Sequence, residues 1–397
     1  MSVHAARAAA RGVCGGAMTG RPLCEGSVNI RGTFHGAVDW VLTRLVTPSA
    51  VQLCSVTVLA SPLISVIVAA HDLQGQLGVC LKSILDQSFR DVEVVAVLDQ
   101  SAHCPADLVD DYARRDGRLS VVRLTGVAGI GRIRNAGAQR AAGDYLLFLD
   151  SDHIVRGETL QAMADRLRAA GEPDVLLFGH TRLHRSRSWP GAAAGLLAQQ
   201  GSEPFAPLDR PEFFGAPAYS WDRLVRRELW TGQQLAFPDG LHEEVTVVHR
   251  AMLAADRIAV LKWNCVQIRR RHTQHPAGSP DGTHFDVFGR YEESFGLLGE
   301  RGALDVVAPA LFTRMIRHYL FLLNLEGCLS RSERPRFFER ASEHYRRYLP
   351  DGYDHPEGRE GVKFQLMASG RYSALEAASL PQRARSLVSR GAALRGR

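Results

Sequence analysis

One stretch near the middle of the chain constrains the fold more than any other. Residues 143–153 read Gly-Asp-Tyr-Leu-Leu-Phe-Leu-Asp-Ser-Asp-His, so an apolar run lies between a Gly-Asp turn signal and two aspartates. A run of this length with aromatic residues is typical of a buried β-strand. Such a strand delivers Asp150 and Asp152 to its carboxyl end, where open α/β sheets bind ligands. The two carboxylates can share a hard divalent cation, and an acidic turn without a metal is the alternative.

The segments around this stretch alternate between strand-like and helical patterns. Apolar runs predict strands at residues 63–70, 92–98, 119–124, 145–149, 175–179 and 258–268. Helical spacing predicts helices that begin near residues 77, 105, 129 and 157. This alternation indicates an α/β fold with a doubly wound, mostly parallel sheet. Right-handed crossovers would then place Asp72, Asp99 and Asp150 along one edge of the sheet.

The rest of the chain is predicted to form an extension and a helical region. Residues 1–60 are rich in Ala, Gly and Arg and hold only two acids, Glu25 and Asp39. We expect a disordered N-terminal extension, with an over-long start of the coding region as the alternative. Residues 61–275 would form the sheet domain, and residues 276–397 a helical C-terminal region. Within the sheet domain, residues 186–217 are predicted to be loop and short helix. Residues 221–230 are predicted to be helical.

Composition restricts the class of protein. The chain has 397 residues, of which 45% are hydrophobic and 23% charged, as in soluble globular proteins. The net charge of +6 is scattered, which favours anionic ligands or a membrane surface over nucleic acid. The seven cysteines form no Cys-x-x-Cys pair, which favours reduced thiols. We therefore expect a cytoplasmic location, with peripheral contact to the cytoplasmic membrane as a further option, and no nucleic-acid partner.

The order of the motifs resembles the family 2 glycosyltransferases, which have the GT-A fold. A strand ending in His71-Asp72 is followed by a strand ending in Asp99, then by Gly-x-Gly-x-x-Arg-Asn-x-Gly at 129–137 and by the stretch at 143–152. Later segments, Trp-Asp-Arg-Leu at 221–224 and His-Glu-Glu at 242–244, fit the same family. The resemblance covers about residues 62–275. The tail at 343–350 is similar to tails on bacterial enzymes of cell-wall polymer synthesis.

The resemblance implies an inverting, metal-dependent sugar transfer. The donor would be a nucleoside diphosphate sugar, expected to be a UDP-sugar, and the acceptor a hydroxyl of a cell-wall, capsular or other glycan or of a polyol-phosphate polymer. Asp150 and Asp152 would hold Mn²⁺ or Mg²⁺, which relieves charge on the leaving diphosphate. Glu244, or its neighbour Glu243, would take the proton of the acceptor hydroxyl. The alternative for these two glutamates is that they stabilise a helix N-terminus.

Further residues are predicted to bind the nucleotide sugar. The free N–H groups of a helix that begins near Gly129 favour an anion, although the glycines can equally make a tight turn. Arginines after the last strand match phosphate oxygens, although charge runs are usually solvated. His153 and His180 are expected in core or surface roles rather than as metal ligands. The predicted nucleotide-sugar-binding residues are His71, Asp72, Asp99, Gly131, Arg134, Asn135, Asp150, Arg271 and His272.

Two other functions fit parts of this pattern. A nucleotidyltransferase also uses a metal and a doubly wound sheet, but it needs a basic, Gly-rich loop after the first strand. Residues 69–72 read Ala-Ala-His-Asp instead. A non-catalytic carbohydrate-binding or partner-binding relative would keep the fold and lose the acids. Because Asp150, Asp152 and Glu244 are all present, an active transferase is the preferred prediction.

Overall fold

The computed structural model describes residues 61–70, 76–100, 105–184, 187–269, 283–325 and 327–378, which all belong to one compact unit. The extension predicted at residues 1–60 lies outside these residues. The same is true of several predicted site residues and basic residues, namely His71, Asp72, Arg270, Arg271, His272 and His275.

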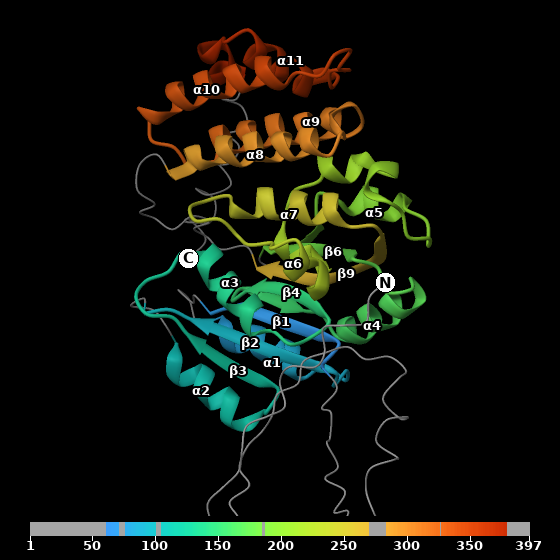
Figure 1. The fold of residues 1–397 in the computed structure, drawn as a ribbon. Helices are drawn as coiled ribbons and strands as arrows, with labels where there is room; N and C mark the ends of the chain where they lie inside the picture. The colour runs from blue at the N-terminus through green and yellow to red at the C-terminus, as the bar shows by residue number, and fades with distance from the viewer. Residues whose placement is uncertain are drawn as a thin grey trace, which may run out of the picture. The chain divides into compact units, whose positions relative to one another are not determined.

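Four parallel strands form the first half of the described sheet (Figure 1). They are β1 (Ile64–Ala69), β2 (Val92–Leu98), β3 (Leu119–Arg123) and β4 (Tyr145–Asp150), arranged in the order β3-β2-β1-β4. Every residue of β1 is buried, as is almost every residue of β2 and β4. Such runs of Val, Ile and Leu suit strands whose two faces are both covered.

The second half of the sheet mixes strand directions. It contains β8 (Arg223–Arg226), β6 (Val175–His184), β9 (Ile258–Arg269) and β5 (His153–Val155), which continue the order as β4-β8-β6-β9-β5, with β7 (Arg187–Pro190) paired to β6. β8 is antiparallel to both of its neighbours, whereas β6 and β9 are parallel to each other. Because β1 to β4 are all parallel and β6 pairs in parallel with β9, the described sheet is mostly parallel. This confirms the predicted fold class.

The helix predicted at residues 221–230 is wrong in its first half. Residues Ser220–Asp222 form a 3-10 turn, β8 follows, and the helix α6 covers only Arg227–Gly232. Leu224 and Val225 are buried because β8 fills the space between β4 and β6. This pairing joins residues far apart in sequence, so a tertiary contact overrides the local helical pattern.

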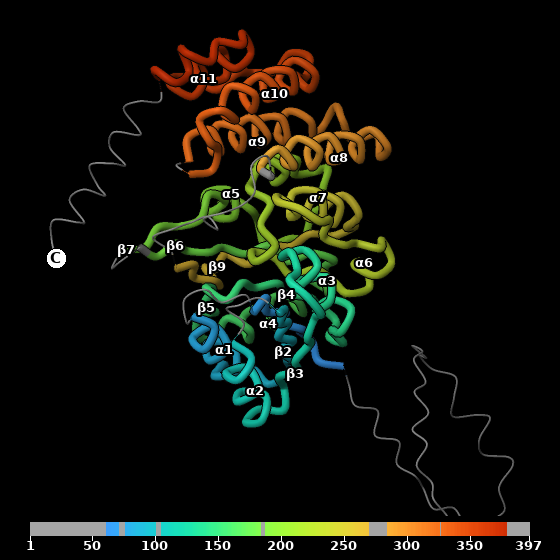
Figure 2. The backbone as a smooth tube through the Cα atoms, turned by 90° about the vertical axis from the view of Figure 1, so that its left-hand side faces the viewer, coloured from blue at the N-terminus to red at the C-terminus, as the bar shows by residue number. Residues whose placement is uncertain are grey.

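Helices cover both faces of the sheet (Figures 1 and 2). One face carries α1 (Leu77–Leu85), α2 (Ala106–Arg115) and α4 (Thr159–Ala169), and the other carries α3 (Ile130–Arg140), α6 and α7 (Glu243–Ala254). Alternate residues of β1 serve the two sides, since Val66 and Val68 belong to one hydrophobic core and Ile67 and Ala69 to the other. This is the period of two that a buried strand requires.

A stack of helices extends the core on the α7 side (Figure 1). It comprises α8 (Asp286–Glu300), α9 (Leu304–Asn324), α10 (Glu333–Tyr348) and α11 (Gly358–Ala368), preceded by the 3-10 turn η5 (Thr283–Phe285). α8 packs on α7, and α9 packs on the 3-10 turn η3 (Pro211–Gly215), which follows α5 (Ala194–Gln199) and η2 (Pro207–Asp209). By length and composition α9 could cross a membrane, but 61% of its apolar window is buried inside the protein.

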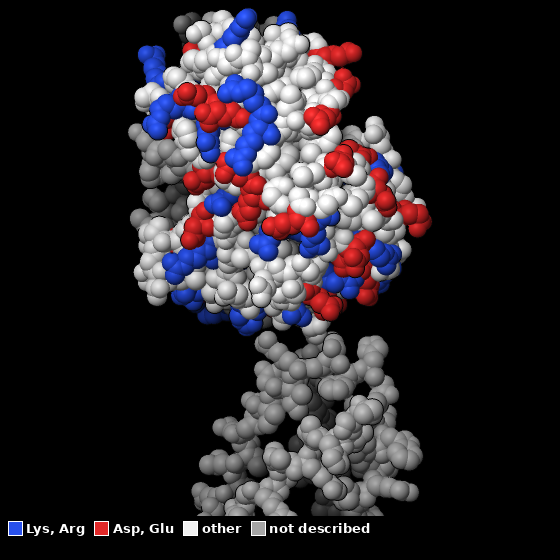
Figure 3. Space-filling view, turned by 45° about the horizontal axis from the view of Figure 1, so that its top comes forward, with Lys and Arg blue, Asp and Glu red and all other residues white. Residues whose placement is uncertain are grey.

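On one face of the described protein, charged side chains are not separated by sign. On the face drawn in Figure 3, Lys and Arg lie interspersed with Asp and Glu. Elsewhere, exposed pairs such as Lys82–Asp86 and Arg114–Asp111 also bring opposite charges together. Such pairs contribute little to stability, because solvent screens exposed charges. The net positive charge therefore produces no broad basic field on this face.

We predict that Gly137→Ala lowers the free energy of unfolding by about 1–3 kcal/mol, because it overfills the contact between α3 and the sheet. A Cβ at position 137 would overlap Ile67 Cγ2 and would lie 3.2 Å from Val97 Cγ2. The matched control is Gly289→Ala in α8, where a Cβ meets nothing within 4 Å. The control should be neutral or slightly stabilising in urea unfolding. Equal effects of the two variants would contradict the packing argument.

Candidate functional site

The carboxyl ends of two parallel strands bring Asp99 and Asp150 to one edge of the sheet. β1 lies between β2 and β4, and Ala69 is in register with both Val97 and Asp150. Asp150 ends β4, and Asp99 directly follows β2. The buried Asp99 carboxylate accepts the Ala128 N–H at 3.0 Å, which holds the loop before α3. Asp99 and Asp150 therefore lie along one edge of the sheet, as predicted. Asp72, which was predicted at the same edge, lies outside the described residues.

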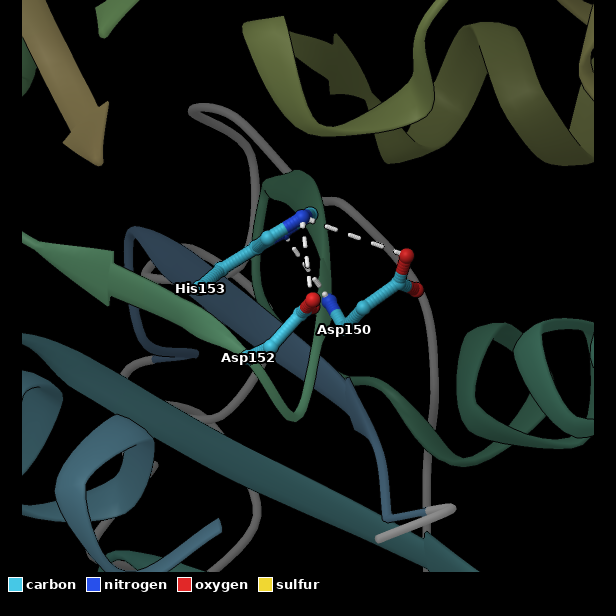
Figure 4. A group of neighbouring side chains, drawn as sticks. All are labelled: Asp150, Asp152 and His153. Atoms are coloured by element: carbon cyan, nitrogen blue, oxygen red, sulfur yellow. Dashed lines mark hydrogen bonds and ion pairs between the residues drawn. The ribbon is translucent and has the colours of Figure 1, made fainter. Parts of the chain in front are cut away.

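Asp150, Asp152 and His153 form a compact group of candidate metal ligands (Figure 4). One oxygen of each carboxylate and a ring nitrogen of His153 all lie within 4.8 Å of one another. The Asp150 and Asp152 side chains are 29% and 14% exposed, so both remain accessible from outside. Two carboxylates suit a hard divalent cation such as Mg²⁺ or Mn²⁺, which prefers oxygen ligands.

The hydrogen bonds of His153 favour an orienting role for its ring. Its Nδ1 accepts the Asp150 N–H at 3.1 Å. A neutral imidazole that accepts at one nitrogen carries its proton on the other, so Nε2 is the donor. Nε2 lies 3.7 Å from an Asp152 oxygen and 4.0 Å from an Asp150 oxygen. His153 therefore lies closer to the acids than the sequence suggested, but its protonation suits a donor to carboxylates better than a metal ligand.

Arg134 joins this group to the two glutamates of α7. Its Nη2 donates to Asp150 Oδ1 at 2.9 Å, and its Nη1 donates to Glu243 Oε1 at 2.6 Å and lies 3.2 Å from Glu244 Oε1. The arginine side chain is 3% exposed. Burial acts to lower the pKa of Arg134, but the nearby Asp150, Glu244 and Glu243 raise it above its ordinary value. A permanent positive charge therefore lies beneath three carboxylates.

Glu243 and Glu244 occupy the first turn of α7, as predicted, but their surroundings differ. Glu243 is buried against Arg134, and burial raises the pKa of its carboxyl. Glu244 is 16% exposed, and its Oε1 accepts the Ser220 hydroxyl at 2.6 Å and the Ser220 N–H at 3.2 Å. Burial, opposed by Arg134 and reinforced by Glu243 and Asp150, raises the pKa of Glu244 to about 7. A carboxylate with this pKa is suited to accept a proton near neutral pH.

Gly131 and Asn135 hold the segment that leads into α7. A Cβ at position 131 would lie 2.8 Å from Pro238 O, so α3 can approach this segment only with glycine there. The Asn135 amide donates to Phe237 O and accepts the Phe237 N–H, both at 2.8 Å. With Arg134, these residues share one face of α3 at helical spacing. Their contacts indicate a positioning role, and contact with a nucleotide sugar stays a prediction.

Sequence reasoning singled out Trp221 as part of a family motif but missed Tyr219 and Ser220 beside it, which help to support the site. Tyr219 and Trp221 stack at 4.4 Å, Trp221 meets the His153 ring edge to face at 4.8 Å, and Ser220 between them bonds Glu244. A lone serine 24 residues before Glu244 carries no spacing signal. His180, expected in a core or surface role, is buried, and burial lowers its pKa to about 4.

The basic cluster predicted after the last strand begins beside the aspartates. β5 pairs with the end of β9, so that His153 is in register with Ile268. The Arg269 N–H donates to Asp152 O at 3.4 Å. The chain therefore leaves β9 next to the candidate metal ligands, and the predicted contacts of Arg271 and His272 lie outside the described residues.

Residues 65–192 match the family model Glycosyl transferase family 2. The chain carries a family 2 glycosyltransferase domain. The matched segment includes Asp99, Arg134, Asp150 and Asp152, whereas Glu243 and Glu244 lie beyond it. The resemblance stated from the sequence motifs is therefore confirmed.

Known relatives of the chain support the same family and fold. EpsH of Bacillus subtilis (strain 168) is 26% identical over 179 residues, which are 45% of this chain and 51% of EpsH. TuaG of the same organism is 30% identical over 169 residues, 42% of this chain and 59% of TuaG. The chain thus spans about half the length of these relatives. The crystal structure of S. aureus TarS 1–349 with UDP-GlcNAc matches with a TM-score of 0.61 at 20% identity, over 81% of this chain and 91% of that one, and shows the GT-A fold.

We predict that Arg134→Gln lowers the free energy of unfolding by about 3–5 kcal/mol at pH 8, because it leaves three carboxylates without their shared cation. The loss should be smaller at pH 5. The pKa values of Glu243 and Glu244 are already raised in the folded state, and loss of Arg134 raises them further above their unfolded values. The stability lost through such groups increases as the pH rises. Arg132→Gln, at an exposed position of the same helix, is the control. A loss independent of pH in denaturant unfolding would contradict this account.

Proposed function

We propose that this protein is an inverting, metal-dependent glycosyltransferase that moves a sugar from a nucleoside diphosphate sugar to a hydroxyl of a glycan acceptor. The observation that carries the proposal is the pair of contacts from Arg134 to Asp150 and Glu244. One guanidinium thereby holds a candidate metal ligand and a candidate base at the same small site. Residues 61–275 would form the transferase domain, and residues 276–397 a helical region whose α8 packs on α7.

Donor and acceptor classes are proposed by similarity. TarS was crystallised with UDP-GlcNAc, so we propose a UDP-sugar as donor. TuaG is named for teichuronic acid biosynthesis, so we propose a cell-wall or capsular polymer, including polyol-phosphate polymers, as acceptor. We propose that Asp99, which follows β2, and Arg134, beside the metal group, contact the nucleotide part of the donor.

Asp150 and Asp152 are the residues that fit a divalent ion, Mn²⁺ or Mg²⁺. Both carboxylates lie at the strand end, and His153 Nε2 lies 4.0 Å from an Asp150 oxygen and 3.7 Å from an Asp152 oxygen. Such an ion, when bound, stabilises the negative charge of the leaving diphosphate. Arg134 limits the repulsion between Asp150 and the glutamates and keeps them close to one another.

Glu244 is the proposed base. The described residues bond its carboxylate through Oε1, which leaves Oε2 for the proton of an acceptor hydroxyl. Ser220 fixes the carboxylate, and a pKa of about 7 lets it accept a proton at neutral pH. The deprotonated acceptor oxygen then attacks the anomeric carbon from the side opposite the departing diphosphate. A single displacement of this kind inverts the configuration of the sugar.

The pH dependence of the reaction should follow Glu244. We predict that kcat/KM rises with pH through an apparent pKa near 7, because the base must lose its proton before it can act. Ser220→Ala should move this limb to higher pH, since the serine hydroxyl lowers the pKa of Glu244. Glu244→Gln should reduce kcat by about 10²–10⁴-fold. The measurement is the pH profile of donor turnover with acceptor.

Glu228→Gln is the matched control, because Glu228 lies exposed in the first turn of α6 and should leave the profile unchanged. An unaltered profile in Ser220→Ala, or full activity in Glu244→Gln, would remove Glu244 from the mechanism. A protein that binds donor but turns over none would favour the carbohydrate-binding alternative.

Metal binding provides a separate test of the aspartates. We predict that Asp152→Asn weakens Mn²⁺ binding in the presence of UDP by more than about tenfold, because an amide is a poorer ligand for a hard cation. Paramagnetic resonance of free Mn²⁺ measures this without any turnover. Asp165→Asn, on the exposed side of α4, is the control. Equal affinities of the two variants would place the ion elsewhere.

A further inference from the structure

The antiparallel hairpin of β6 and β7 carries one aromatic and two basic side chains on the same face. Arg182 on β6 is in register with Trp189 on β7, and side chains that are directly opposite in such a pair share a face. Arg187 lies two residues before Trp189 and is therefore on this face too. Trp189 is 46% exposed, Arg187 is exposed and Arg182 is partly buried. These three residues, named the hairpin platform here, belong to a hairpin that extends from the body of the sheet (Figure 2).

A short series of contacts connects the hairpin platform to the proposed base. Arg182 donates a hydrogen bond to the Tyr219 hydroxyl, and its Cζ lies 5.7 Å from the centroid of the Tyr219 ring. The next residue, Ser220, donates to Glu244 Oε1 at 2.6 Å. A molecule bound on the platform would therefore lie beside the segment that holds Glu244.

The two arginines of the platform are not neutralised by acids. Within the part of the chain that the structure describes, neither Arg182 nor Arg187 forms an ion pair with a carboxylate. Arg182 donates instead to a neutral phenol, that of Tyr219. A guanidinium in this state suits a carboxylate or phosphate group of a ligand, whose two oxygens match its paired N–H groups.

Protection of a sheet edge explains only part of this composition. β7 pairs with β6 alone among the described strands, and Arg187 and Pro190 on such an edge limit pairing with other chains. An exposed tryptophan does not serve that purpose, because it adds apolar surface to the edge. Its indole offers a broad flat surface, and the C–H face of a sugar ring is apolar as well. Together with the arginines, Trp189 favours a glycan with anionic groups over a neutral glycan or a simple anion.

We propose that the hairpin platform binds the acceptor, and that this acceptor is a glycan bearing carboxylate or phosphate groups. Trp189 packs on a sugar ring, and Arg182 and Arg187 contact the anionic groups. The glycan then extends past Tyr219 toward Glu244, which receives the proton of its hydroxyl. This inference rests on the proposed function, because the platform is an acceptor subsite only if Glu244 acts on an acceptor hydroxyl.

The test is the affinity of the full-length protein for soluble glycans, measured by calorimetry without donor. Oligogalacturonate supplies carboxylates, phosphomannan supplies phosphates, and neutral mannan supplies neither. At least one anionic glycan should bind more tightly than neutral mannan, and its binding should weaken with salt. Trp189→Ala should reduce that affinity about tenfold, as expected for truncation of an aromatic side chain in a binding site. Trp189→Phe should restore most of it, and Arg187→Gln should reduce it about fivefold.

Two exposed residues far from the hairpin in sequence provide matched controls. Phe321→Ala removes an aromatic side chain of α9 that is 54% exposed, and Arg114→Gln removes a charge of α2 that is 69% exposed. Both variants should keep the wild-type affinity. The proposal is overturned if the wild-type protein binds neither anionic glycan, or if neutral mannan binds as tightly as they do. It is also overturned if the platform variants bind like the controls.

Binding and sugar transfer can fail separately in this experiment. If the platform variants lose affinity in a protein that transfers no sugar, the platform remains a glycan-binding site and the proposed function is wrong. If the wild-type protein transfers sugar to one of these glycans and the platform variants keep its KM for that glycan, the platform is not the acceptor subsite and the proposed function stands.

Discussion

A single buried guanidinium determines how the candidate site is put together. Arg134 reaches one carboxylate at the end of β4 and two at the start of α7, with a side chain that is 3% exposed. Without a cation at this point, three acids at such short range would not all stay ionised. The arginine also fixes their relative positions, because its planar fork allows few geometries. The proposed base and the proposed metal ligands are therefore parts of one electrostatic unit.

The remainder of the fold brings the partners of Arg134 to it. Parallel strands carry Asp99 and Asp150 to one edge, and α3 lies across that edge with Gly131 in contact with the segment before α7. The Asn135 side-chain amide donates one hydrogen bond to the Phe237 backbone and accepts another from it, and so holds the segment that leads into α7. Ser220, in the turn before β8, completes the support of Glu244. Each contact is short and local in space, although the residues are distant in sequence.

The separation of contacting residues along the sequence explains which features the sequence could predict and which it could not. Strands that form from continuous apolar runs were predicted well, and the observed bounds of β2 equal the predicted ones. The position of Glu243 and Glu244 at a helix start was also predicted, because charge and apolar spacing mark that boundary. β8 was missed because its burial depends on two strands, β4 and β6, that it joins only after folding. Ser220 was missed for a similar reason, since its role depends on a glutamate 24 residues away.

The antiparallel strand between β4 and β6 also has a consequence for how the chain is made. The partners of β8 are synthesised before it, so both expose an unpaired edge until residue 226 has left the ribosome. Open edges of this kind can pair with other chains. The acids of α7 begin 17 residues after residue 226, at Glu243, so the two halves of the site meet only after this edge is paired. Nascent chains that stall in this interval should need chaperone protection.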